Sequence, residues 1–208
     1  MDSLGLSPVN FFCIKARISK AKLLKKQNHE KHLLPDTSSF CDETSFAKLA
    51  MAWNDDGLEF FATVQKPFET AFYPEITKGD SLELFIDTRN VKTKSFVSQF
   101  CHHFVFLPTR IDDIQAKEIT RFRTEDRHEL CMSKDLMCQT QFEKKTYSLS
   151  ITIPRHCLTG YDPEQYRELG FTYRFNRPAN PPQHFSVKTS EYSFEQYPSL
   201  WGSLELVS

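Results

Sequence analysis

The stretch from Lys78 to Arg89 constrains the fold more than any other part of the chain. A Gly-Asp pair predicts a turn at its start, and apolar residues then recur at every second position, at Leu82, Leu84 and Ile86. This period is typical of a β-strand that buries one face. The opposite face carries Ser81, Glu83, Phe85 and Asp87. A carboxylate beside a ring on such a face indicates either solvated surface or the floor of a ligand site.

Alternation of this kind recurs along the chain, and turn residues predict hairpins between the runs. The segment Asn54-Asp55-Asp56-Gly57 separates runs 46–53 and 57–65, and residues 143–146 separate runs 137–142 and 147–153. In Tyr161–Leu169, an Asp cap, a following proline and Gly170 predict a helix of one or two turns. With about nine to eleven strands, the pattern predicts an all-β fold. We expect a two-sheet antiparallel β-sandwich, jelly-roll-like or immunoglobulin-like, with one or two short helices.

Size and charge narrow the class of protein. A chain of 208 residues can bury a large core, and its 19 phenylalanines suit the wide gap between two packed sheets. No repeat or linker divides the chain, so we expect one domain over residues 1–208. The 26 basic and 27 acidic residues give a net charge of −1, which offers no electrostatic basis for binding nucleic acid or an anionic membrane.

Targeting signals and cysteines bear on location. No apolar run approaches the ~20 residues of a membrane-spanning helix, and the first ten residues lack the features of a signal peptide. We therefore predict a cytoplasmic protein whose cysteines are reduced, mostly buried thiols. The alternative is an exported protein with three disulfides. The six cysteines, which form no CxxC pair, are Cys13, Cys41, Cys101, Cys131, Cys138 and Cys157.

The order of these segments resembles that of a known family. Gly79 to Asp87, read as GDSLELFID, resembles the D-S-[VL]-E-[IL]-F-[IL]-D motif of family 9 carbohydrate-binding modules and the related DOMON-like β-sandwiches. Trp53 to Phe60 resembles their early hairpin, and Trp201 to Leu206 resembles a closing strand. The similarity covers residues 46–207, and the central motif is its most specific part.

The resemblance implies a non-catalytic sugar-binding module. In that family the motif glutamate and an asparagine on a late strand hydrogen-bond sugar hydroxyls, two tryptophan rings clamp the sugar, and calcium supports loops. Carried over by position, these polar roles fall to Glu83 and Asn176. The stacking tryptophan before the motif is replaced by Thr77-Lys78-Gly79, and His102-His103 stand where the family has an arginine. A retained fold with an altered ligand is consistent with these departures.

We predict a ligand site on the face opposite the apolar set of each strand. Its candidate residues are Glu83, Phe85, His103, Arg174 and Asn176. A solvated polar surface is the alternative for the charged members. Phe61 is expected on the same side as Phe85, where both rings would replace the missing tryptophans or be covered by a loop or a second subunit. The two tryptophans, Trp53 and Trp201, are interpreted as core or edge packing.

Metal and catalytic signals are weak. Asp55, Asp56 and Asp87 could supply oxygen ligands to calcium, although turn chemistry explains the first two, and we expect no other cofactor. His29 and His32 are three residues apart, whereas the HExxH zinc motif needs four. No nucleophile motif or phosphate-binding loop is present, so we predict no catalytic residue and no enzyme.

The sequence therefore predicts a non-catalytic binding module for a sugar or another small polar molecule. The alternative is a protein-interaction or structural domain that has lost sugar binding.

Overall fold

The computed structural model describes residues 14–94, 96–188 and 192–208, and every regular element among them is a strand or a short 3₁₀ turn. The strands are β1 (Lys15–Ser19), β2 (Ala47–Asn54), β3 (Gly57–Val64), β4 (Ser81–Asp87), β5 (Cys101–Ile111), β6 (Ile114–Glu118), β7 (Met137–Phe142), β8 (Tyr147–Pro154), β9 (Glu168–Arg177), β10 (Asn180–His184) and β11 (Gly202–Val207). The turns are η2 (His29–His32), η3 (Ser38–Cys41), η4 (Ile76–Lys78), η5 (Ser133–Asp135), η6 (Arg155–Cys157), η7 (Phe194–Gln196) and η8 (Pro198–Leu200). The all-β prediction is confirmed.

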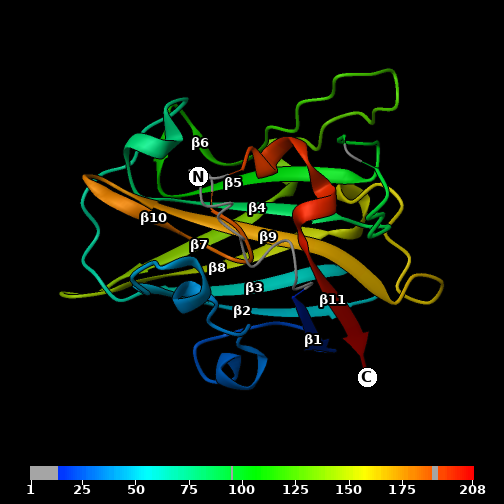
Figure 1. Cartoon of the computed structure of the whole chain (residues 1–208). Helices are drawn as coiled ribbons and strands as arrows, with labels where there is room; N and C mark the ends of the chain where they lie inside the picture. The colour runs from blue at the N-terminus through cyan, green and yellow to red at the C-terminus, as the bar shows by residue number, and fades with distance from the viewer. Residues whose placement is uncertain (1–13, 95, 189–191) are drawn as a thin grey trace, which may run out of the picture.

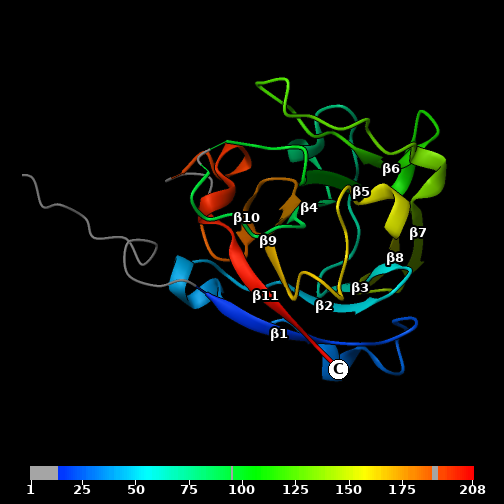
Figure 2. The ribbon, with the colours of Figure 1, turned by 90° about the vertical axis from the view of Figure 1, so that its right-hand side faces the viewer.

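Two sheets form the layers of a sandwich (Figure 1). The seven-stranded sheet runs β1-β11-β9-β4-β5-β6, with β10 also paired to β9, and the four-stranded sheet runs β2-β3-β8-β7. Figure 2 looks along the strands and shows β1 and β11 at one side of the sandwich and β6 and β7 at the other. The predicted antiparallel sandwich is present, with one parallel pair of named strands, β1 and β11. These two strands come from opposite ends of the chain, so no hairpin dictates their direction.

The core lies between the sheets, and the alternation of β4 is confirmed. Leu82, Leu84 and Ile86 are fully buried in the main apolar cluster. The rings of Phe60 on β3 and Phe171 on β9 stack across the gap, with centroids 6.2 Å apart. The phenylalanine content thus fills the space between the layers, as expected.

The predicted β2–β3 hairpin is present, with Asn54 paired to Gly57. Gly57 has a φ of 145°, and a Cβ there would lie 2.2 Å from the carbonyl oxygen of Ile153 on β8. Only glycine combines this backbone conformation with such close approach of a neighbouring strand. The turn therefore depends on both the Asx residues and the glycine.

The first carboxylate of the motif has a structural role at the entry to β4. Asp80 is fully buried, and its side chain accepts hydrogen bonds from the Glu69 amide at 2.9 Å and the Tyr147 hydroxyl at 3.2 Å. Arg177 forms an ion pair with it at 3.1 Å. These contacts join β4 to β8 and β9, which sets the position of the residues that follow on β4.

The predicted helix over Tyr161–Leu169 is wrong. Asp162 and Pro163 start a single turn, in which the Asp162 side chain accepts hydrogen bonds from the amides of Glu164 and Gln165. The chain then becomes β9, because Leu169 is needed in the core and Gly170 pairs with Asp87 of β4. Packing of β9 in the centre of the sheet therefore outweighs the local signals for the start and end of a helix.

Several strand ends differ from the prediction at prolines. Pro108, expected to end its strand, lies within β5 at a shift in the β5–β6 register, where its missing N–H removes no ladder hydrogen bond. The proline-rich segment 177–183, expected as a loop, turns back as the irregular strand β10. The strand predicted to start at His184 instead ends there.

The prediction of six reduced cysteines is wrong for one pair, since Cys131 and Cys157 form a disulfide. Cys101 is a buried free thiol and Cys138 a partly buried one, as expected. Cys13 lies outside the described residues, as does the side chain of Cys41. Within the part of the chain that the structure describes, no helix is both long and apolar enough to cross a membrane.

Candidate functional site

Strand register brings the predicted polar residues together on the outer face of the seven-stranded sheet. On β4, Glu83 pairs with Arg174 of β9, and Ser81 pairs with Asn176. On the other side of β4, Phe85 pairs with His103 of β5. Directly opposed residues of paired strands share a face, so the alternation of each strand places these side chains in one cluster.

Glu83 is the centre of this cluster. Arg174 donates from Nε to Oε1 at 2.7 Å and from Nη2 to Oε2 at 2.9 Å, which is the bidentate geometry of a strong ion pair. Asn176 Nδ2 donates to Oε1 at 2.7 Å, and His103 Nε2 lies 2.8 Å from Oε2. All five predicted ligand-site residues are therefore close neighbours, since the His103 ring also stacks on Phe85 with centroids 4.0 Å apart.

The surroundings keep Glu83 ionised. Burial alone would raise its pKa, but the hydrogen bond from His103 and the charge of Arg174 outweigh burial and lower the pKa to about 2. For Arg174, burial works against the cation, yet the neighbouring carboxylates of Glu83 and Glu195 raise its pKa. The pair is thus charged over the whole physiological range.

The solvated-surface alternative is wrong for Glu83, because its side chain is fully buried. The chain returns over this face through η7 and η8, the red turns just before β11 in Figure 1. Phe194 of η7 meets the ring of Phe85 edge-on, with centroids 5.1 Å apart, and Trp201 packs at 5.8 Å. Of the alternatives for Phe85, cover by a loop is therefore the one found.

A pocket of about 450 Å³ remains beside this cover. Its lining includes four of the five predicted residues, namely Glu83, Phe85, His103 and Arg174. The fifth, Asn176, contacts the site through its hydrogen bond to Glu83. His103 is the more accessible of the two adjacent histidines, with 16% of its side chain exposed, while His102 points to the opposite face and is buried, as strand geometry predicts.

Sequence reasoning missed other residues of the pocket. Glu195 forms an ion pair with Arg174 Nη1 at 2.7 Å, and Trp201, interpreted as packing, is buried but also lines the cavity. Thr77, at the place of the family's stacking tryptophan, lies at the same pocket. The aromatic residues at 192–201 could have indicated a binding surface in the sequence. Their position over β4, however, depends on a contact between distant parts of the chain.

Phe61 does not belong to this site. It faces outward from the four-stranded sheet, on the opposite side of the sandwich from Phe85, and clusters with Leu24. The His29 ring lies 4.5 Å from it. The basic segment 20–34, expected as a helix or surface loop, therefore covers this second face. The placement of Phe61 beside Phe85 is wrong because adjacent elements in the sequence lie in different sheets.

The three aspartates proposed for calcium do not form one cluster. Asp55 binds Lys20 at 2.8 Å, while the carboxylate of Asp87 accepts hydrogen bonds from the amides of Arg89 and Val91. Among the described residues, the groups of His, Cys, Asp and Glu whose ligand atoms converge within 4.8 Å do not include these aspartates. Turn chemistry accounts for their positions, and calcium binding stays a prediction.

Comparison with known proteins places the fold. No protein-family model and no curated protein matches the chain. A family 9 carbohydrate-binding module from Caldicellulosiruptor kristjanssonii in complex with cellotriose has a TM-score of 0.67 at 16% identity, over 92% of this chain and 93% of that chain. Its complex with glucose gives 0.66 at 15%, over 93% and 96%. A proposed carbohydrate-binding protein from Bacteroides uniformis gives 0.57 at 8%, over 94% and 100%. The likeness confirms the expected fold.

Proposed function

We propose that this chain is a non-catalytic carbohydrate-binding module whose ligand site is the pocket over β4. The observation that carries the proposal is the convergence of Glu83, Arg174 and His103 at the floor of a cavity of about 450 Å³. Ligand sites commonly enclose about 300–1,000 Å³ and present a few oriented polar groups beside aromatic surface. The fold shared with modules solved with cellotriose and glucose supports a sugar as the ligand class.

The contacts of Glu83 give it an indirect role in this proposal. A carboxylate offers about four lone-pair sites, and Arg174, Asn176 and His103 already make four hydrogen bonds to Glu83. A sugar hydroxyl would therefore meet the groups that Glu83 orients. We assign ligand contact to His103 and Arg174, with Glu195 and Gln196 at the wall, and positioning to Glu83 and Asn176.

A binding experiment with matched variants tests the proposal. The full chain is screened on a glycan array, and the best ligand is titrated by calorimetry. Gln196→Ala, in the pocket wall, should weaken binding by about tenfold, which corresponds to about 1.4 kcal/mol, or one polar contact. Gln139→Ala, on the exposed face of β7 in the other sheet, should leave binding unchanged. A flat response to every sugar, or equal losses in both variants, would remove the proposal.

A protein-interaction role is the second candidate, and strand β7 favours it. This strand is the edge of the four-stranded sheet, and Met137 and Phe142 at its ends are each more than half exposed. Unpaired edges with apolar side chains invite pairing with another strand. Light scattering over a concentration series tests self-association through this edge, and a monomer at high concentration would count against it.

A cytoplasmic location, which the sequence predicts, is also part of the proposal, and the disulfide of Cys131 and Cys157 is the observation against it. Cytosolic reductants keep most thiols reduced, so the state of Cys131 and Cys157 in cells is a direct test. Trapping free thiols before lysis should label this pair if the location is correct. A disulfide that survives trapping would indicate an oxidising compartment.

A further inference from the structure

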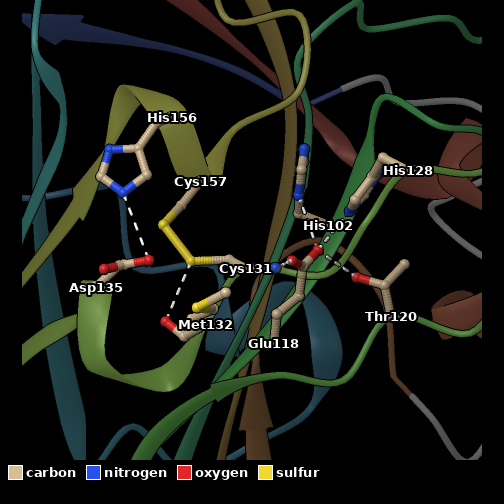
Figure 3. Close-up of a disulfide and its surroundings, with 9 residues drawn as sticks. All are labelled: His102, Glu118, Thr120, His128, Cys131, Met132, Asp135, His156 and Cys157. Atoms are coloured by element: carbon tan, nitrogen blue, oxygen red, sulfur yellow. Dashed lines mark hydrogen bonds and ion pairs between the residues drawn. A yellow bond between two sulfur atoms is a disulfide. The ribbon is translucent and has the colours of Figure 1, made fainter.

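Another buried carboxylate, Glu118, lies at the end of β6, on the opposite side of the sheet from the pocket. Glu118 Oε1 lies 2.9 Å from His102 Nδ1 and 2.8 Å from His128 Nε2, and it accepts a hydrogen bond from Thr120 Oγ1 at 2.7 Å. Its other oxygen accepts the amide proton of Cys131 at 2.7 Å. Figure 3 shows the two imidazoles and the threonine around the carboxylate, with the disulfide beside them. The side chains of Glu118 and His102 are fully buried.

The position of the proton on the His128 ring determines whether Nε2 can donate a hydrogen bond to Glu118. His128 Nδ1 lies 2.6 Å from the backbone carbonyl oxygen of Gln99, which only accepts hydrogen bonds, so Nδ1 carries a proton. In the neutral ring, Nε2 then presents a lone pair to a carboxylate oxygen 2.8 Å away. Two lone pairs at that distance repel. A positive charge between them, either a second proton on the ring or a metal ion, removes the repulsion.

Crowding at one oxygen favours the metal. Three groups approach Oε1, whereas one carboxylate oxygen offers about two lone-pair sites. We propose that His102 Nδ1, His128 Nε2 and Glu118 Oε1 form a binding site for a divalent transition-metal ion, with Zn²⁺ the best match. Two imidazoles and one carboxylate are a common protein ligand set for zinc, which completes its coordination with a further group.

The geometry is close to that required. The three ligand atoms lie within 4.8 Å of one another. Bonds of about 2.0–2.1 Å at tetrahedral angles separate ligand atoms by about 3.3 Å, so each imidazole would retreat from the carboxylate by roughly half an ångström. Two of the three ligands have support from neighbouring groups, because Gln99 orients His128, while Thr120 and Cys131 orient Glu118. Metal-binding histidines typically donate their other N–H to a carbonyl in this way.

Two aromatic rings pack against the proposed ligands. Phe104 stacks on His102 with centroids 5.6 Å apart, and Phe122 meets His128 edge-on at 4.8 Å. His128 comes from the connection between β6 and η5, much of which is exposed.

A neighbouring group must be distinguished in the test. Cys131, Asp135 and Cys157 also converge within 4.8 Å, and His156 lies 3.7 Å from Asp135. In the disulfide form the two sulfurs bond to each other and supply no thiolate. The thiol-containing group is therefore an alternative site only after reduction.

Zinc titration of the full, oxidised chain tests the proposal. After treatment with EDTA and its removal, Zn²⁺ is titrated in competition with a chromophoric chelator. We expect one Zn²⁺ per chain with a Kd below about 1 µM, and a melting temperature raised by zinc. His128→Asn and His102→Asn should each weaken binding by at least about 100-fold. The control His156→Asn, in the neighbouring group, should bind as tightly as the parent chain.

Two further measurements separate loss of zinc binding from loss of folding and from binding by the cysteines. Far-ultraviolet circular dichroism identifies variants that remain folded, and Glu118→Gln, close in size to the parent residue, replaces any histidine variant that does not fold. Co²⁺ in place of Zn²⁺ should give tetrahedral absorption without a thiolate charge-transfer band. No binding, unchanged affinity in a folded His128→Asn, or loss of binding only in Cys131→Ala/Cys157→Ala would overturn the proposal.

Discussion

Removal of the Arg174 guanidinium would leave a buried carboxylate without its main partner. In Arg174→Leu, Glu83 keeps the hydrogen bonds from Asn176 and His103 but loses the two from Arg174. Truncating one member of a buried ion pair typically costs about 3–5 kcal/mol, because the remaining charge stays desolvated. We expect a loss of this size in the free energy of unfolding at pH 7.

The pKa of Glu83 gives a second route to the magnitude. Its ordinary value is 4.5, and the folded protein lowers it to about 2, with the His103 hydrogen bond and the Arg174 charge outweighing burial. At about 1.36 kcal/mol per pKa unit, the difference corresponds to about 3 kcal/mol. Because the folded pKa is the lower one, this stability is fully present above pH 4.5 and is lost as the pH falls towards 2.

Urea denaturation of four proteins, followed by tryptophan fluorescence between pH 2 and 7, separates these contributions. The set is the parent chain, Arg174→Leu, Glu83→Gln, and the double variant Glu83→Leu/Arg174→Leu. Glu83→Gln should remove about 3 kcal/mol of the pH dependence below pH 4.5, and the double variant should be more stable than Arg174→Leu at pH 7. A cost below about 1 kcal/mol for Arg174→Leu, or an unaltered acid profile in Glu83→Gln, would refute the reasoning.

Three other perturbations have defined outcomes. Burial raises the pKa of Glu59 to about 7, so ionised Glu59 destabilises the folded protein increasingly as the pH rises from 4.5 through 7. Glu59→Gln should therefore be more stable than the parent at pH 8, by about 1–3 kcal/mol in urea titrations, where screening by water sets the lower value. Gly57→Ala should cost at least about 2 kcal/mol by the same method, because its Cβ would meet the Ile153 carbonyl at 2.2 Å; equal stability would contradict the turn geometry. Replacement of Cys131 and Cys157 by alanine should lower the free energy of unfolding by about 3 kcal/mol, because their disulfide closes a loop with a sequence separation of 26. If the number of free thiols does not change on reduction, the disulfide is absent.

Local periodicity predicted the strands but not what covers them. Leu82, Leu84 and Ile86 alternate, and the structure buries them as expected because alternation directly reports which residues share a face. The same pattern says nothing of the other face, where Phe194 and Trp201 return from over a hundred residues away and pack on Phe85, beside the buried Glu83. Burial of that carboxylate therefore depends on tertiary contacts that no short window contains.

The site formed by Glu118, His102 and His128 likewise could not be predicted from local sequence. Glu118 lies 16 residues from His102 and 10 from His128, so no short window of the sequence contains all three residues. Their meeting depends on the β5–β6 register and on the return of the following connection across the end of the sandwich. The one local property of the group is strand alternation, which makes the adjacent His102 and His103 face opposite ways.

That opposition makes the two proposed sites separable by experiment. The pleat of β5 sends His103 to Glu83 in the pocket and His102 to Glu118 in the interior, with distances of 2.8 Å and 2.9 Å. Thr120 connects the two sites, because its hydroxyl accepts the His103 amide proton, donates to Glu118, and lines the pocket. If the sites act independently, His103→Asn should alter sugar binding alone and His102→Asn zinc binding alone, each measured in the same preparation. Loss of both ligands in either folded variant would show instead that Thr120 and the β5 backbone transmit the change across the sheet.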